Sequence, residues 1–166
     1  LAAPLFRWRH GRHLQNQGTR LHLHTGDGLA LLAECTRAMP GAFFWFDNLL
    51  GQLRFTREPL DAVSRRLQML PQTLQHVAWG SVHDRMSGRT VPGSTLPSSR
   101  QGLAGVAMET AEGQAWLQKI GAISPWLDHL TEQVLPAGTP VQHIAWPFKP
   151  GYVHWLEMGW CPPARA

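Results

Sequence analysis

Three short stretches of the sequence carry acidic, amide or imidazole side chains directly after a hydrophobic segment. These stretches are Gly26-Asp27-Gly28, Asp47-Asn48 and His83-Asp84. A carboxylate beyond a strand accepts hydrogen bonds from a ribose hydroxyl or an exocyclic amine, and an asparagine offers both a donor and an acceptor. A His-Asp pair suits general-base catalysis, because histidine titrates near neutral pH. The three stretches are therefore the candidate site of the chain.

The segments around these stretches predict strands that alternate with helices. The predicted strands span residues 20–24, 42–46 and 76–82, and the predicted helices between them span residues 29–39 and 58–70. The continuous apolar run 42–46 is typical of a strand buried on both faces. If these strands are parallel, their carboxyl ends meet at one edge of the sheet, where ligands bind in open α/β sheets. Asp27, Asp47 and Asn48 would then lie at that edge.

The sequence over residues 86–135 predicts a long loop followed by two helices. Residues 86–104 are rich in Gly, Ser, Thr and Pro, which favours a loop. Helices are predicted over about 109–120 and 125–135. In the second of these, Ser124 would cap the helix and Pro125 would occupy its first turn.

The end of the chain predicts an antiparallel hairpin. Its strands would span 141–148 and 152–160, joined by a type II turn with Pro150 and Gly151 at the centre. The predicted fold class is therefore α/β. We expect a Rossmann-like, mostly parallel sheet with helices on both faces and a C-terminal antiparallel β-hairpin.

This order of motifs resembles the later part of a class I S-adenosylmethionine-dependent methyltransferase. The resemblance rests on the closing hairpin and on three motifs, which are His24-Thr25-Gly26-Asp27-Gly28-Leu29, Phe46-Asp47-Asn48-Leu49-Leu50-Gly51 and Trp79-Gly80-Ser81-Val82-His83-Asp84. It implies S-adenosylmethionine as the cofactor and a methyl acceptor that the sequence does not identify.

The resemblance also implies roles for individual residues. In that family the Gly-Asp turn lies beside the adenine ring, so Asp27 would bind the adenine amine. The other residues expected to bind the cofactor are Gly26, Gly28, Leu29 and Asp47. The residues expected to be catalytic are Asn48, His83 and Asp84.

Two parts of the methyltransferase pattern have no counterpart in this sequence, namely the glycine-rich loop after the first strand and the acid that binds the ribose. The chain begins at Leu1 rather than Met and leaves no room for them before Arg20. We therefore expect a basic arm over 1–19, an α/β domain over 20–160 that lacks its N-terminal portion, and a tail over 161–166. A protein partner or a second copy would cover the exposed sheet edge.

Two other functions stay open. The arm interleaves Arg7, Trp8 and Arg9, which suits a nucleic-acid-binding or scaffolding module. His22 and His24 share one face of a predicted strand, and together with His83-Asp84 they predict a histidine-based, metal-dependent hydrolase. The methyltransferase interpretation assigns no metal ligand.

The composition indicates a globular, cytoplasmic protein. The hydrophobic fraction is 43% and the formal net charge is +4. The two cysteines fit neither a disulfide framework nor a zinc-ligand pair. No apolar run approaches the roughly 18–20 residues that a membrane span needs, so we expect no membrane partner.

Overall fold

The computed structural model describes residues 27–94, 96 and 99–164 of the chain. The chain divides into two compact units, Leu1–Ala38 and Met39–Ala166, and each is described by itself. Within the described residues, no helix combines the length and the hydrophobicity needed to cross a bilayer.

The described part of the first unit is a turn followed by α2 (Leu32–Ala38). The Oδ1 atom of Asp27 accepts hydrogen bonds from the backbone N–H groups of Leu29 and Ala30, at 3.0 and 3.3 Å. An acceptor at this position satisfies amides that have no partner inside a helical turn. The predicted helix over 29–39 is confirmed, and the predicted strand over 20–24 lies outside the described residues.

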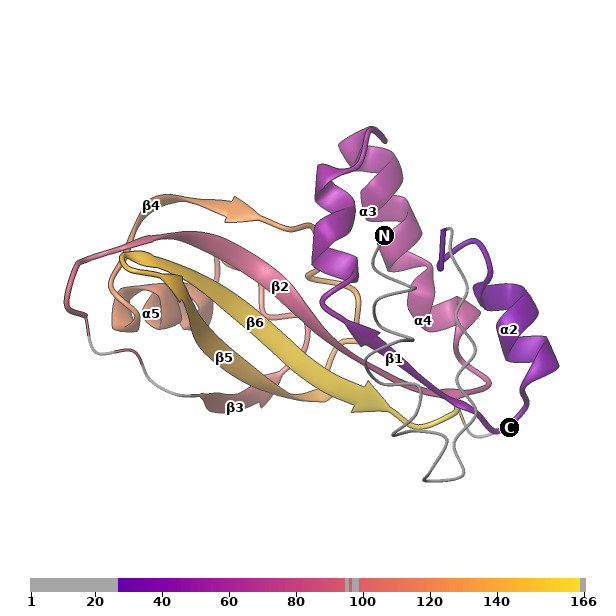
Figure 1. Cartoon of the computed structure of the whole chain (residues 1–166). Helices are drawn as coiled ribbons and strands as arrows, with labels where there is room; N and C mark the ends of the chain where they lie inside the picture. The colour runs from indigo at the N-terminus through magenta and orange to yellow at the C-terminus, as the bar shows by residue number, and fades with distance from the viewer. Residues whose placement is uncertain (1–26, 95, 97–98, 165–166) are drawn as a thin grey trace, which may run out of the picture. The chain divides into compact units, whose positions relative to one another are not determined.

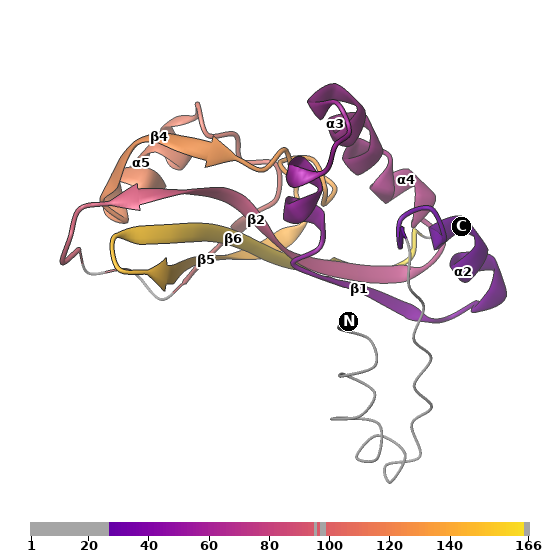
Figure 2. The same cartoon turned by 45° about the horizontal axis from the view of Figure 1, so that its top comes forward.

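The second unit is built around one sheet that is mostly antiparallel. Its strands are β1 (Phe43–Asp47), β2 (Ala78–Thr90), β3 (Arg100–Leu103), β4 (Ala122–Asp128), β5 (Pro140–Lys149) and β6 (Tyr152–Cys161). They follow the order β1-β2-β6-β5-β3, with β4 paired to β2 (Figures 1 and 2). Among the described strands, only β1 and β2 pair in parallel. The prediction of a Rossmann-like, mostly parallel sheet is therefore wrong.

The error arises in the segment that was predicted to be loop and helix. β2 extends to Thr90, because β6 pairs with it along one edge. On its other edge, β1 pairs with the first half of β2 and β4 pairs with the second half. Pro125 lies inside β4, where an edge strand tolerates a residue without an N–H group. Pairing with β2 thus overrides the local signals for a helix over 125–135.

The helices of the second unit agree better with the sequence. They are η1 (Leu50–Phe55), α3 (Leu60–Gln68), α4 (Leu70–Thr73) and α5 (Ala111–Lys119). Val63 and Leu67, four residues apart on α3, are buried on one side of it. At the start of α5, the Oγ1 atom of Thr110 accepts a hydrogen bond from the N–H group of Gly113 at 3.1 Å. Both predicted helices, 58–70 and 109–120, are confirmed.

One buried apolar cluster joins the sheet to α5. Its members come from β2, from α5 and the residue that follows it, and from the hairpin strands, and they are Met86, Trp116, Ile120, Ala145, Val153 and Trp155. The rings of Trp116 and Trp155 lie 6.2 Å apart. β1, by contrast, is only partly buried, because Phe43 and Trp45 are 53% and 46% exposed. The prediction that this strand is buried on both faces is wrong.

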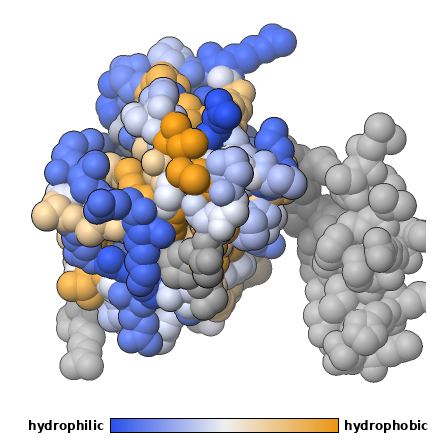
Figure 3. All heavy atoms as spheres, turned by 90° about the vertical axis from the view of Figure 1, so that its left-hand side faces the viewer, coloured by the Kyte–Doolittle hydropathy of each residue, from blue (hydrophilic) through white to orange (hydrophobic). Residues whose placement is uncertain are grey.

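The C-terminal hairpin is confirmed as β5 and β6. Gly151 has a φ of +69°, the left-handed conformation that a type II turn requires after Pro150. Figure 3 looks onto the end of the molecule where this turn lies. Hydrophilic side chains cover most of that face, and hydrophobic side chains form a smaller patch among them.

Candidate functional site

Three side chains with metal-binding chemistry meet in the second unit. Asp84 comes from β2, His129 directly follows β4, and His154 comes from β6. One ligand atom of each lies within 4.8 Å of the ligand atoms of the other two. Within the described part of the chain, no other group of His, Cys, Asp and Glu has this spacing. We call these residues the Asp84 cluster.

Asp84 is fully buried and uses both of its carboxylate oxygens. Its Oδ1 atom lies 2.7 Å from Nδ1 of His154. Its Oδ2 atom accepts a hydrogen bond from the side-chain amide of Gln52 at 3.3 Å. The carboxylate is therefore held between a histidine of β6 and an amide of η1.

The hydrogen bonds of His129 fix the tautomer of its ring. Nδ1 lies 3.1 Å from the carbonyl oxygen of Gly51, which only accepts, so Nδ1 carries the proton. Nε2 then accepts from the hydroxyl of Ser87 at 2.9 Å, and the Ser87 oxygen lies 3.1 Å from that of Tyr152. Burial lowers the pKa of His129, although the Gly51 carbonyl and the charge of Asp84 oppose this shift. The imidazole is consequently neutral near pH 7.

A β-bulge in β2 brings this group of side chains to one face. The register of β2 against β6 shifts between Asp84 and Met86. In an uninterrupted strand, Asp84 and Ser87 would point to opposite faces, but an extra residue reverses the alternation after it. The carbonyl oxygen of Arg85, the extra residue, accepts a hydrogen bond from the N–H group of His129 at 3.0 Å. The bulge thus positions both Ser87 and His129.

Two close contacts hold the backbone around Asp84. The Thr131 hydroxyl donates to the carbonyl oxygen of Asp84 at 2.6 Å, and Thr131 is fully buried. The backbone of η1 also approaches Asp84, at Gly51. A Cβ atom on Gly51 would lie only 2.9 Å from the Cβ of Asp84. The position therefore requires glycine for the close approach of the two segments.

A pocket of about 500 Å³ adjoins the Asp84 cluster. The polar or charged residues that line it are Asn48, Gln52, Ser87, His129, Lys149, Tyr152 and His154. Its apolar lining consists of Phe55, Leu127, Trp146 and Phe148. The side chain of His154 is 14% exposed, whereas that of Asp84 is 0% exposed. A small molecule in the pocket would therefore reach the cluster through its histidines.

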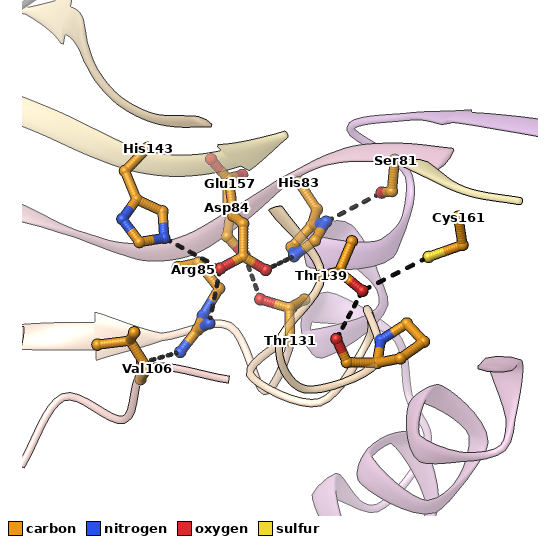
Figure 4. A network of polar contacts seen from close by, with 11 residues as sticks. Ser81, His83, Asp84, Arg85, Val106, Thr131, Thr139, His143, Glu157 and Cys161 are labelled. Atoms are coloured by element: carbon orange, nitrogen blue, oxygen red, sulfur yellow. Dashed lines mark hydrogen bonds and ion pairs between the residues drawn. The ribbon is translucent and has the colours of Figure 1, made fainter. Parts of the chain in front are cut away.

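A second buried group lies on the opposite face of the sheet and is drawn in Figure 4. The Oε2 atom of Glu157 lies 3.2 Å from both Nη1 of Arg85 and Nε2 of His143. Nε2 of His83 approaches Oε1 of Glu157 to 3.5 Å. None of these four side chains is more than 2% exposed. We call them the Glu157 cluster.

The pKa of Glu157 shows that this cluster holds a carboxylate anion. Burial alone raises the pKa of Glu157, but His143, His83 and the charge of Arg85 outweigh this effect and lower the pKa to about 2. Burial lowers the pKa of His83, so this ring is neutral near pH 7. The guanidinium of Arg85 also donates to the carbonyl oxygen of Val106 at 2.9 Å. The Glu157 cluster is thus a buried ion pair between Glu157 and Arg85, with a histidine beside each carboxylate oxygen.

The structure separates the three residues that were predicted to be catalytic. Asn48 lines the pocket, and its backbone N–H donates to the carbonyl oxygen of Val82 at 2.8 Å. Asp84 contacts His154 of the same pocket. His83 belongs instead to the Glu157 cluster, because neighbouring residues of a strand point to opposite faces. Asp84 therefore pairs with a histidine of another strand rather than with its neighbour in the sequence.

The residues predicted to bind the cofactor are also dispersed. Asp47 is exposed at the end of β1 and is not among the residues that line the pocket. Asp27, Gly28 and Leu29 belong to the first unit, where Asp27 caps a helical turn. Gly26 lies outside the described residues, as do His22 and His24. The binding of S-adenosylmethionine by these residues stays a prediction.

Sequence reasoning missed His129 and His154. Tyr152 and His154 lie two apart in a correctly predicted strand, so a shared face was foreseeable from their spacing. His129 fell in a segment that was predicted to be helical. Its approach to Asp84 depends on the pairing of β4 with β2, which is a long-range contact without a local signal.

Comparison of the chain with protein-family models, with curated proteins and with solved structures found no match. The function must therefore be argued from the geometry of the site.

Proposed function

We propose that the protein is a metal-dependent hydrolase whose divalent ion is bound by Asp84, His129 and His154. The observation that supports this most is the approach of three ligand atoms to within 4.8 Å of one another beside a pocket. Carboxylate oxygen and imidazole nitrogen are ligands of Zn²⁺, Fe²⁺ and Mn²⁺. Catalytic zinc sites use three protein ligands and leave a further position for water or substrate.

The hydrogen bonds around the cluster match those of metal ligands. A histidine that binds a metal through one ring nitrogen donates the other N–H to a carbonyl or carboxylate oxygen. His129 has this arrangement, because its Nδ1 donates to Gly51 and its Nε2 has a lone pair, which accepts from the Ser87 hydroxyl here and would turn to the ion. The Oδ2 atom of Asp84 is similarly held by Gln52.

A hydrolytic reaction needs no further cofactor at such a centre. A divalent ion lowers the pKa of bound water to about 7 and polarises a carbonyl or phosphoryl oxygen. The hydroxyl groups of Ser87 and Tyr152 lie beside His129. An ion on Nε2 of His129 would replace the Ser87 hydrogen bond, and these hydroxyls could then donate to a substrate oxygen. The pocket accommodates a small molecule at this point.

A second candidate is a metal-free enzyme in which His154 is the general base. The 2.7 Å contact between Asp84 and His154 favours it, because a carboxylate at Nδ1 makes Nε2 the basic atom of the ring. Methyl transfer has no such observation in its favour, since the sheet implied by the resemblance is not the one found. The basic arm of the nucleic-acid alternative, including Arg7 and Arg9, lies outside the described residues.

Zinc titration separates the two candidates. Protein treated with EDTA and dialysed should bind one Zn²⁺ per chain in isothermal titration calorimetry, and protein purified without added metal should contain Zn, Fe or Mn. Asp84→Asn should abolish this binding, whereas Asp61→Asn, which alters an exposed carboxylate of α3, should not. Zinc should also restore hydrolysis of 4-nitrophenyl esters to the treated protein.

Two results would contradict the metal centre. The first is the absence of saturable binding of Zn²⁺, Fe²⁺ and Mn²⁺. The second is ester hydrolysis that persists in EDTA and is lost in His154→Gln, which would favour the metal-free general base.

A further inference from the structure

We infer that the pocket beside the Asp84 cluster binds an aromatic carboxylate, a small molecule with a flat ring and one negative charge. This inference rests on the proposed function, because it names the class of substrate that the same site would take. Two features of the pocket wall carry it, namely a group of exposed aromatic rings and a single lysine.

The rings around the pocket expose much of their apolar surface. Phe55, Trp146 and Phe148 are 61%, 41% and 56% exposed. The rings of Trp146 and Phe148 lie 5.6 Å apart on β5, and Phe55 at the end of η1 lies 5.7 Å from the ring of His129. Large rings gathered at a pocket are typical of ligand sites rather than of ordinary surface. An aromatic ligand would cover them in stacked or edge-to-face contacts.

The charge of the pocket wall selects an anion. Lys149 lines the pocket, and its Nζ atom lies 5.3 Å from the centre of the Tyr152 ring. Among the described residues that line the pocket, none is an aspartate or glutamate, and Lys149 is the only lysine or arginine. One ammonium group matches a carboxylate with one charge better than a phosphate with two. The ring would then lie among the aromatic side chains, with the carboxylate at Lys149.

Calorimetry on EDTA-treated wild-type protein tests this inference with 1-naphthoate as the probe. Naphthoate should bind at least about tenfold more tightly than 1-naphthylmethanol, which lacks the charge, and cyclohexanecarboxylate, which lacks the flat ring. Lys149→Met should weaken naphthoate binding about tenfold and leave naphthylmethanol binding unchanged. The matched control is Lys119→Met, because Lys119 on α5 is exposed, lies outside the pocket and is the only other lysine of the chain.

A second variant tests the rings separately. Trp146→Leu should weaken naphthoate and naphthylmethanol alike and leave cyclohexanecarboxylate unchanged. The inference is overturned if naphthoate does not bind, if the alcohol binds equally well, or if Lys149→Met has no more effect than Lys119→Met. These titrations contain no metal. A failure of naphthoate binding therefore leaves the zinc result valid, and a failure of zinc binding leaves the naphthoate result valid.

Discussion

Each face of the sheet holds a buried carboxylate beside two histidines, yet the two groups differ in what neutralises the charge. Glu157 pairs with the guanidinium of Arg85 at 3.2 Å. The Asp84 carboxylate is instead held by His154 and by the neutral amide of Gln52. A buried anion is stable only when it is paired or binds a metal. The comparison indicates that the Glu157 carboxylate already has a cationic partner, whereas the Asp84 cluster has the ligands for a cation beside a pocket.

Replacing single histidines on each face by glutamine gives the sharpest test of this difference. We expect His129→Gln and His154→Gln each to weaken Zn²⁺ binding at least about 100-fold, since each removes a ligand. The matched variants His83→Gln and His143→Gln should leave the affinity almost unchanged. Calorimetric titration of the four proteins measures this directly. Equal losses of Zn²⁺ affinity for the variants of both faces would show that the substitutions act on folding rather than on metal coordination.

Removing the negative charge of Glu157 should cost the most stability. We expect Glu157→Gln to lower the free energy of unfolding by about 3–5 kcal/mol at pH 7, because it leaves the charge of Arg85 buried without a counter-ion. Urea denaturation followed by tryptophan fluorescence measures this change. Glu58→Gln is the control, because Glu58 forms a more exposed pair with Arg66, and it should cost less than about 1 kcal/mol. A cost as small for Glu157→Gln would show that this buried ion pair does not stabilise the fold.

The same carboxylate should make stability depend on acid pH. The pKa of Glu157 is about 2 in the folded chain and 4.5 as an ordinary value, so the unfolded chain binds the proton more readily. The stabilisation is complete above about pH 5 and is lost as the pH falls toward 2, by roughly 3 kcal/mol. Unfolding of the wild type and Glu157→Gln between pH 2 and 6 should therefore give curves that converge in acid. Parallel curves would show that Glu157 titrates normally.

The sequence was sufficient for the elements that local signals specify. The terminal hairpin followed from Pro150-Gly151 between two strand-like segments, and α5 followed from its helical pattern. The sheet order was not accessible in this way, because β4 pairs, among the described strands, only with β2, and the second half of β2 becomes a strand by pairing with β4 and β6. Their segments contain Ser, Gly and Pro residues that locally favour loops and helix starts.

The prediction of the candidate site was incomplete for a related reason. Asp84 and Asn48 were chosen because they follow apolar segments, and both lie at or beside the pocket. The partners of Asp84 were missed because the bulge at Arg85 changes which residues of β2 share a face. A one-residue shift reverses every later side chain of a strand, so a pattern of alternation cannot reveal it. His129 and His154 also lie 45 and 70 residues after Asp84 in the numbering of the chain.

A substitution at Gly51 should disturb the Asp84 cluster and spare the Glu157 cluster. We expect Gly51→Ala to lower the free energy of unfolding by about 1–3 kcal/mol and to weaken Zn²⁺ binding, because the new Cβ would press on Asp84 at 2.9 Å. Gly28→Ala is the control, since among the described residues, its chain neighbours aside, no atom lies within 4 Å of the position of its Cβ. Zinc titration and urea denaturation of both variants provide the measurement. Unchanged zinc affinity in Gly51→Ala would show that the position of η1 is irrelevant to the cluster.

The smallest effect should come from the hydroxyl that fixes the loop carrying His129. Thr131→Val keeps the shape of the side chain but removes its hydrogen bond to the carbonyl oxygen of Asp84, which should cost about 1 kcal/mol. We expect a few-fold loss of zinc affinity as well, because His129 lies two residues earlier in the same loop. Thr139→Val removes a comparable bond, to the carbonyl oxygen of Pro136 at 2.7 Å, away from the cluster. If the two variants bind zinc equally well, the loop after β4 does not preorganise the ligands, and the contrast between the two faces would depend on the carboxylates alone.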